Sequence, residues 1–164
     1  MILRAVLCWL VCSIVLGAKL FAAPLDTVSF DQLPALQQKE RRLVFVLIST
    51  DWCKYCHTMR RSLEDSTLAP LLKNSYYYVV LNAAEQRPIT FNRHTFRYKP
   101  NGAQVGVHEL AAWLGKDKEG HISYPTLCIL NEKNEILFRY NGFLRRKELH
   151  KVLTYYVSPS AIDE

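Results

Sequence analysis

The sequence has few cysteines, few methionines and no apolar run long enough for a typical membrane-spanning helix. Its 164 residues include five cysteines and two methionines. The N-terminal apolar run, Ala5 to Ala18, ends at Lys19, whereas a membrane-spanning helix needs roughly 20 apolar residues. No internal repeat or low-complexity tract occurs. These absences leave a globular chain with a short apolar segment at its start.

The first 23 residues have the pattern of a secretory signal peptide. One base, Arg4, precedes the apolar run, and the small residues of "FAAP" follow it. We expect residues 1–23 to be removed on export and residues 24–164 to form a single domain in the periplasm or otherwise secreted. No clean A-x-A site precedes Pro24, so the cleavage site is uncertain, and an uncleaved membrane anchor is the alternative.

Charge and cysteine content narrow the function of the remaining domain. Residues 1–23 contain Arg4, Lys19 and no acid, so their loss lowers the formal net charge from +6 to +4. Such a charge gives no indication of a nucleic-acid partner. Only Cys53, Cys56 and Cys128 remain, too few for a scaffold held together by disulfides. The close pair indicates chemistry, whereas Cys128, in an apolar run, is expected to be a small core residue.

Apolar patterns predict strands that alternate with helices. Residues 43–49 and 76–82 are apolar on both faces, as in buried parallel strands. "PTLCILN" and "ILFRY", separated by "EKNE", predict a hairpin. Helices are predicted at 29–40, directly after the cysteine pair, within 65–74, at 107–115 and at 144–157. This order predicts an α/β fold with a central mixed sheet and helices on both faces.

The stretch "DWCKYCHTM", residues 51–59, allows two interpretations. C-x-x-C is a redox dithiol, and C-x-x-C-H is an attachment site for c-type haem. A small c-type cytochrome is mostly helical and needs a second axial ligand, but strands bracket this motif. Met59 lies too close to His57 to be that ligand, which leaves only a distant histidine: His94, His108, His121 or His150. The predicted strands favour the dithiol, and a haem carrier is kept as a remote alternative.

Three motifs in order carry a resemblance to a known family. W-C-x-x-C follows an apolar strand, "YPT" (124–126) opens a later strand, and "NGF" (141–143) precedes the last helix. In these motifs the chain resembles the thioredoxin superfamily, and in particular secreted proteins related to the C-terminal periplasmic domain of the thiol:disulfide interchange protein DsbD. The resemblance implies a thioredoxin-like fold, with an insertion at about 83–105 before the helix that precedes the cis-proline strand.

The position of the cysteine pair suggests its chemistry. Cys53 is expected at a helix N-terminus, where free N–H groups and the helix dipole favour a thiolate and Lys54 adds positive charge. Cys53 would attack a substrate disulfide as the nucleophile, and Cys56, one turn further along and more buried, would resolve the mixed disulfide. No metal and no cofactor beyond this redox-active disulfide is expected.

Neighbouring residues are assigned to substrate binding or tuning. Trp52 is expected to pack beside the dithiol and shape a docking surface. The resemblance implies that Pro125 is a cis-proline facing the dithiol, that the backbone next to Thr126 pairs with an extended substrate, and that Tyr124 flanks this contact. His57 is expected on an exposed helix face, where its charge would tune the thiolate.

One position departs from thioredoxin itself. Members of the family that resemble thioredoxin carry a buried aspartate six positions before the first cysteine, and here that position is Leu47. Proton transfer to Cys56 would then use water or another acid, with Glu85 and Glu109 as the candidates.

The segment from Gln86 to His108 contains no acid and four strong bases. Loops of this length inside compact domains are uncommon and often functional. If strands 43–49 and 76–82 are parallel, the segment leaves the sheet at the same edge as the dithiol. We therefore expect a partner-selecting lip that contains Arg93, Arg97 and Lys99.

Together these features predict a monomeric thiol:disulfide oxidoreductase that reduces or exchanges protein disulfides and takes electrons from a membrane donor of DsbD type. The alternative is a thioredoxin-like module that binds extended polypeptides and uses its dithiol little.

Overall fold

The computed structural model describes residues 25–102 and 106–158. The predicted signal peptide, residues 1–23, lies outside these ranges. Within them, no helix combines the length and the apolar character that crossing a membrane requires.

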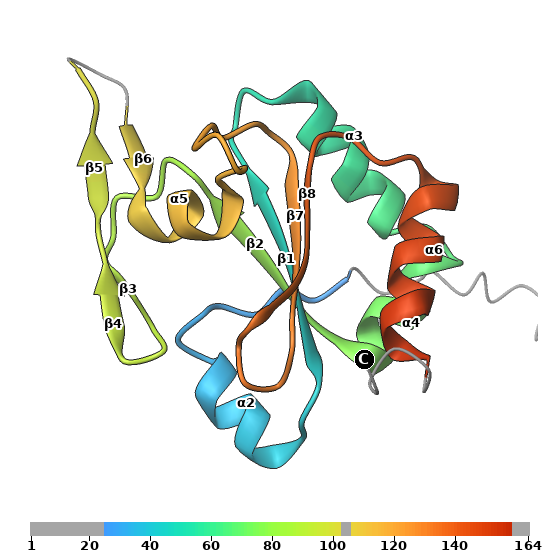
Figure 1. Cartoon of the computed structure of the whole chain (residues 1–164). Coiled ribbons are helices and arrows are strands. Elements are labelled where there is room, and N and C mark those ends of the chain that lie inside the picture. Colours follow the sequence, from blue (N-terminus) through green and yellow to red (C-terminus); the bar gives the residue numbers. More distant parts are fainter. Residues whose placement is uncertain (1–24, 103–105, 159–164) are drawn as a thin grey trace, which may run out of the picture.

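A four-stranded sheet forms the centre of the molecule, in the order β2-β1-β7-β8 (Figure 1). Its strands are β1 (Leu43–Ser49), β2 (Tyr76–Asn82), β7 (Thr126–Leu130) and β8 (Ile136–Asn141). β1 runs parallel to β2 and antiparallel to β7, which in turn runs antiparallel to β8. The predicted mixed sheet is confirmed. The C-terminal ends of β1 and β2 and the start of β7 therefore meet at one edge.

Helices cover both faces of the sheet, as predicted. One face carries α2 (Leu33–Lys39) and α5 (Glu109–Gly115), and the other carries α3 (Lys54–Leu63), α4 (Leu68–Ser75) and α6 (Arg146–Val157), as Figure 1 shows.

β1 alternates between two separate hydrophobic cores. Val44, Val46 and Ile48 pack with residues of α2 and α5, whereas Phe45 and Leu47 pack with residues of α3, α4 and α6. An uninterrupted apolar run is therefore required, because both faces of this strand are buried.

The insertion is not the long loop that the sequence predicts. It forms two hairpins, β3 (Ile89–Phe91) with β4 (His94–Phe96) and β5 (Tyr98–Pro100) with β6 (Gly106–His108). Asn92 and Arg93 form the first turn, with φ values of 51° and 63°. Positive φ at both turn positions is typical of a two-residue hairpin loop, and the sequence Asn-Gly usually indicates such a loop. Here Arg93 takes the place of that glycine, so the sequence does not indicate a hairpin.

His108 ties the insertion to the main body. Its side chain is fully buried, Nδ1 accepts a hydrogen bond from the Leu110 N–H at 3.2 Å, and Nε2 lies 3.2 Å from the Arg87 carbonyl. Its backbone N–H donates to the Ala83 carbonyl at 2.8 Å. The two ring contacts require the neutral tautomer with hydrogen on Nε2.

This environment makes stability depend on pH. Burial lowers the pKa of His108, although the Arg87 carbonyl and the charges of Glu85 and Glu109 oppose the change. Between its lowered folded-state pKa and the ordinary value near 6.5, the unfolded chain binds a proton that the folded chain does not. The contribution of His108 to the free energy of unfolding is therefore fully present above pH 6.5 and is lost as the pH falls. We expect His108→Asn to flatten the fall in urea midpoint between pH 7.5 and 5.5.

His150, exposed on α6, supplies the matched control. His150→Gln should keep the wild-type pH dependence. An unchanged pH dependence in His108→Asn would contradict this account.

Candidate functional site

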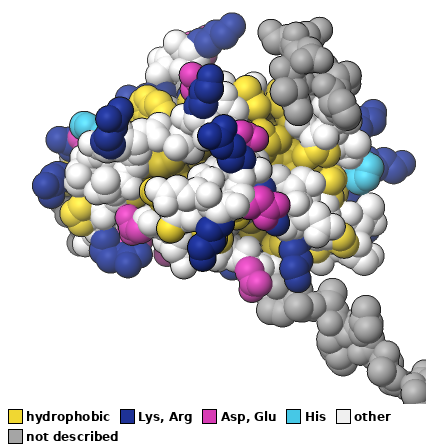
Figure 2. Space-filling model, turned by 90° about the horizontal axis from the view of Figure 1, so that it is seen from below, with side chains coloured by type: hydrophobic (Ala, Val, Ile, Leu, Met, Phe, Trp, Pro, Cys, Tyr) yellow, Lys and Arg dark blue, Asp and Glu magenta, His cyan; other side chains and the backbone are white. Residues whose placement is uncertain are grey.

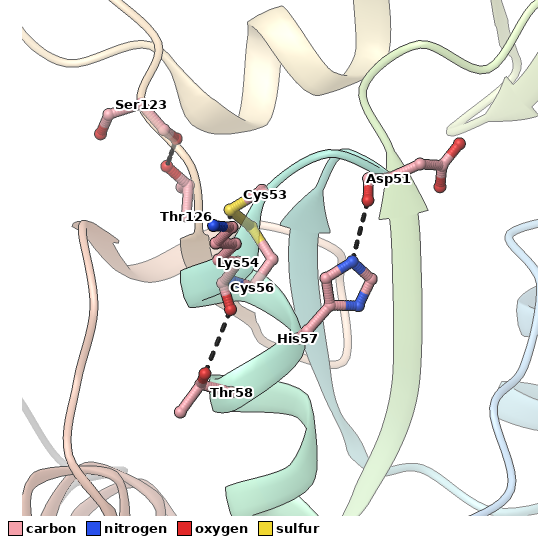
Figure 3. Close-up of a disulfide and its surroundings, with 8 residues drawn as sticks. All are labelled: Asp51, Cys53, Lys54, Cys56, His57, Thr58, Ser123 and Thr126. Atoms are coloured by element: carbon pink, nitrogen blue, oxygen red, sulfur yellow. Dashed lines mark hydrogen bonds between the residues drawn. A yellow bond between two sulfur atoms is a disulfide. The ribbon is translucent and has the colours of Figure 1, made fainter.

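The cysteine pair lies where β1 turns into α3. Cys53 is the N-cap of α3, and its Sγ accepts a hydrogen bond from the Cys56 backbone N–H at 3.1 Å. Cys53 and Cys56 are joined by a disulfide across the first turn of the helix (Figure 3). A helix N-terminus favours negative charge, so a donor already aimed at Cys53 Sγ would stabilise a thiolate there once the disulfide opens.

The expected contrast in exposure between the two cysteines is absent from this disulfide form. Cys53 is 4 % exposed and Cys56 is 3 % exposed, so Cys56 is not appreciably more buried than Cys53 in this state. Their surroundings do differ. The hydrogen bond reaches Cys53 Sγ, whereas Cys56 lines a small pocket between α3 and the ends of β1 and β2.

The loop before β7 faces the disulfide. The Tyr124–Pro125 peptide bond is cis, and the Pro125 carbonyl accepts a hydrogen bond from the Gly142 N–H at 2.8 Å. Gly142 belongs to the "NGF" motif, so two of the three motifs meet here.

Thr126 holds this loop in place. Its hydroxyl donates to the Ser123 carbonyl at 2.7 Å and accepts from Asn141 Nδ2 at 3.0 Å. The side chain is fully buried, and the backbone pairs with Ile48 and Asn141 inside the sheet. Thr126 was expected beside the backbone that pairs with a substrate, and in the structure its side chain supports the loop that carries Tyr124 and Pro125.

Four aromatic side chains form two pairs, each of which includes a residue next to one of the cysteines in the sequence, and we call the four the aromatic collar. Trp52 is 76 % exposed and lies edge-on to Tyr124, with ring centroids 6.0 Å apart. Tyr55 is 67 % exposed and lies 5.8 Å from Phe143. Exposed aromatic residues that gather at one place are typical of interaction surfaces. Tyr55 and Phe143 were not predicted as site residues, although both lie inside motifs that the sequence displays.

His57 and Lys54 occupy the exposed side of the first turn of α3. The His57 ring points back toward the β1–α3 turn, and its Nε2 lies 2.8 Å from the Asp51 carbonyl (Figure 3). His57 is therefore held by a hydrogen bond, whereas the sequence predicted only an exposed position. Lys54 directly follows Cys53 and adds positive charge beside it.

Neither acid named as a proton carrier is placed for that role. Hydrogen bonds from Arg87 lower the pKa of Glu85 to about 2. The Arg97 backbone N–H, and then Lys99, lower the pKa of Glu109. Neither carboxylate lines the pocket beside Cys56, whereas Leu47, 1 % exposed, is one of its lining residues. The expectation that Glu85 or Glu109 serves Cys56 is therefore wrong.

The three bases of the expected lip do not lie together. Asn134 Nδ2 donates to Asn92 Oδ1 at 2.8 Å, which ties the β3–β4 turn to the β7–β8 turn. The β7–β8 turn lies at the opposite ends of the strands from the dithiol. The prediction that Arg93 belongs to the lip is therefore wrong. Lys99 pairs with Glu109 at 3.2 Å and borders a pocket that Ile122 also lines, two residues before Tyr124.

On the face opposite the dithiol, Lys and Arg are scattered among acidic and apolar side chains (Figure 2).

Cys128 is unsuited to exchange chemistry. It is fully buried on β7, its Sγ donates to the Leu114 carbonyl at 3.0 Å, and burial raises the pKa of its thiol to about 11. Within residues 25–102 and 106–158, no group of three or more His, Cys, Asp or Glu side chains could hold a metal ion.

Comparison with known proteins agrees with this geometry. Residues 30–157 match a family model described as a thioredoxin-like domain. Among solved structures, a thioredoxin from Thermus thermophilus is 22% identical over 87% of this chain and 95% of its own, with a TM-score of 0.58. A thioredoxin-fold protein from Helicobacter pylori is 14% identical over 75% of this chain and 73% of its own, also with a TM-score of 0.58.

A disulphide isomerase from Xylella fastidiosa is 12% identical over 78% of this chain and 87% of its own, with a TM-score of 0.52. Comparison with curated proteins finds no match. At these identities the solved structures support the fold alone, and the family model covers most of the chain. The chain therefore belongs to the thioredoxin-like domain family.

Proposed function

We propose that this protein is a thiol:disulfide oxidoreductase that acts outside the cytoplasm on protein disulfides. The observation that supports this most is the position of Cys53 at the N-cap of α3, where the Cys56 N–H donates to its sulfur. Pro125 and the aromatic collar lie beside the pair. An inert structural disulfide would need neither an activating helix terminus nor exposed aromatic side chains around it.

The reaction follows from the two environments. The Cys53 thiolate attacks a substrate disulfide and forms a mixed disulfide, which releases one substrate thiolate. The Cys56 thiolate then attacks Cys53 Sγ, closes the Cys53–Cys56 disulfide and releases the second. Two electrons pass from the dithiol to the substrate, and the protein must be reduced again for another cycle.

An extended polypeptide fits the site better than a compact small molecule. The Pro125 carbonyl and the Thr126 backbone are already used inside the protein. Tyr124, directly before them, is the residue with whose backbone a substrate strand would pair. Trp52 and Tyr124 would cover one side of that strand, and Tyr55 and Phe143 would cover the other.

The remaining parts of the proposal come from the sequence. The N-terminal pattern supports export, and the resemblance to the C-terminal domain of DsbD supports a reductase or exchanger that a membrane electron donor of that type reduces. We propose that the protein acts as a monomer, because a collar open to solvent can dock its clients without a second copy.

Turnover of a protein disulfide separates this proposal from a binding module. The oxidoreductase should reduce insulin disulfides catalytically with dithiothreitol, and the equilibrium potential of Cys53–Cys56 should lie in the range of exchange catalysts. A module would instead bind an unfolded peptide equally well as wild type and as Cys53→Ser, without turnover.

Without Arg93, the proposed lip consists of Arg97 and Lys99 and leads to a prediction about partner recognition. Arg97 and Lys99 are exposed on the insertion, and their charge would raise the encounter rate with an acidic partner more than the final affinity. Replacing both with serine should slow exchange with a protein partner several-fold at low salt and weaken its salt dependence. The rate with a small neutral disulfide should not change.

Arg93→Ser is the matched control, because Arg93 lies at the opposite edge of the sheet. It should leave both rates unchanged. If Arg93→Ser slows protein exchange as much as the double variant, net charge rather than a local lip is responsible.

A further inference from the structure

The pocket beside Cys56 is lined by polar groups from three elements. It has a volume of about 230 Å³ and lies between α3 and the ends of β1 and β2. Cys56, His57 and Arg60 of α3 line it together with Thr50 and Asp51 of the β1–α3 turn, while β2 contributes Asn82. The charged and titratable groups that line the pocket together with Cys56 are Asp51, His57 and Arg60.

Thr50 indicates that water enters this pocket. Its side chain is 6 % exposed, and among the described residues no protein group lies within hydrogen-bond distance of its hydroxyl. A buried hydroxyl without a partner destabilises the fold, so such groups are usually bonded to ordered water. The pocket has room for several water molecules, since one occupies about 30 Å³ in the liquid. Water bonded to Thr50 would lie in the pocket that Cys56 also lines.

His57 is the base suited to receive a proton from that water. The Asp51 carbonyl can only accept, so His57 Nε2 carries the hydrogen of that bond and Nδ1 of the neutral ring is free to take up a proton. An imidazole is a better proton acceptor near neutrality than a carboxylate. Arg60 stays protonated and cannot accept. Asp51 is also engaged by Asn82 Nδ2, at 3.2 Å from Oδ2.

We propose that His57 accepts the Cys56 proton through water held by Thr50, and so performs the task that a buried aspartate would perform at position 47. The inference rests on the proposed oxidoreductase function. The Cys56 S–H bond breaks, the proton passes through water to His57 Nδ1, and the Cys56 thiolate attacks Cys53 Sγ. The S–S bond to the substrate breaks as the Cys53–Cys56 bond forms, and the released substrate thiolate takes a proton from solvent.

A two-phase reaction isolates this step. Reduced protein mixed with 4,4′-dipyridyl disulfide releases one thiopyridone when Cys53 attacks and a second when Cys56 resolves the adduct. His57→Gln should slow the second phase about tenfold or more near pH 7 and affect the first phase far less, since a positioned proton acceptor typically contributes about 10²–10⁴-fold. Above about pH 9 the two proteins should converge, because a thiol with an ordinary pKa near 8.5 then ionises without help.

Two further variants test the role of water. Thr50→Val removes the hydroxyl and should slow the second phase in the same pH-dependent way, whereas Thr50→Ser keeps the hydroxyl and should retain the wild-type rate. His150→Gln, at an exposed site on α6, controls for the loss of a surface imidazole, and Cys56→Ser confirms the assignment of the second phase.

The outcomes are distinct. Slowing near neutrality with convergence at high pH supports the inference. Equal rates for wild type and His57→Gln at every pH would overturn it, as would an equal slowing at every pH, which indicates a merely structural role. If wild type releases neither thiopyridone, the proposed function itself fails, and the inference with it.

Discussion

Cys56→Ser protein recovered from exporting cells is expected to carry client proteins in mixed disulfides with Cys53. The variant can form the first adduct but has no thiol with which to resolve it. Cys53→Ser should trap none and should lose insulin reduction down to the uncatalysed rate. Non-reducing electrophoresis followed by mass spectrometry of the cross-linked peptides measures both results.

Cys128 is the internal control for this experiment. Its buried, hydrogen-bonded thiol should appear in no client adduct, and Cys128→Ser should leave trapping by Cys56→Ser unchanged. Adducts that form through Cys56 or Cys128 as often as through Cys53 would show that the nucleophile has been assigned wrongly.

Phe45→Ala should have the largest effect on stability of the substitutions considered. Phe45 is fully buried on β1, and its ring lies 6.1 Å from that of Tyr76 and 5.7 Å from that of Tyr78. Removing a buried phenylalanine ring leaves a cavity and costs about 3–5 kcal/mol. Native domains have only about 5–15 kcal/mol of stability, so much of the population should unfold at mild urea concentrations. Equilibrium urea unfolding followed by circular dichroism measures the change.

Leu137→Ala provides the comparison for Phe45→Ala. Leu137 lies on the edge strand β8 and is 43 % exposed, so its truncation should change the free energy of unfolding by about 0.5 kcal/mol or less. Similar losses in the two variants would mean that Phe45 does not occupy a tightly packed core.

Most of the sheet was predictable because β1, β2 and β7 are buried on both faces. Residues 43–49 and 76–82 are found as β1 and β2 with the predicted bounds. Their continuous apolar runs distinguish them from surface strands, and "EKNE" correctly separates β7 from β8. The helix ends were less accurate: the first helix was predicted at 29–40 and spans Leu33–Lys39. Caps and local turns decide such ends, and they leave weaker patterns than core periodicity does.

The site was predictable only in part, because its shape depends on contacts between distant segments. The cysteine pair and Pro125 stand in sequence motifs, but the pairing of Asn92 with Asn134, which moves Arg93 away from the dithiol, joins residues 42 positions apart. The hairpins β3–β4 and β5–β6 have strands of only three residues each, too short for an alternating pattern to be seen. The burial of His108 likewise depends on Arg87 and α5 together.

Leu47 removes a conflict between stability and catalysis that a buried acid at this position would create. A carboxylate buried beneath a reactive thiol must be desolvated to do its work, so it weakens the fold that holds it. Such residues underlie trade-offs in which stabilising substitutions impair activity. Here the position beneath the dithiol is a fully packed hydrocarbon side chain. Substitutions that improve the packing of this part of the core can therefore accumulate in evolution or design without altering the pKa of an acid that acts on the dithiol.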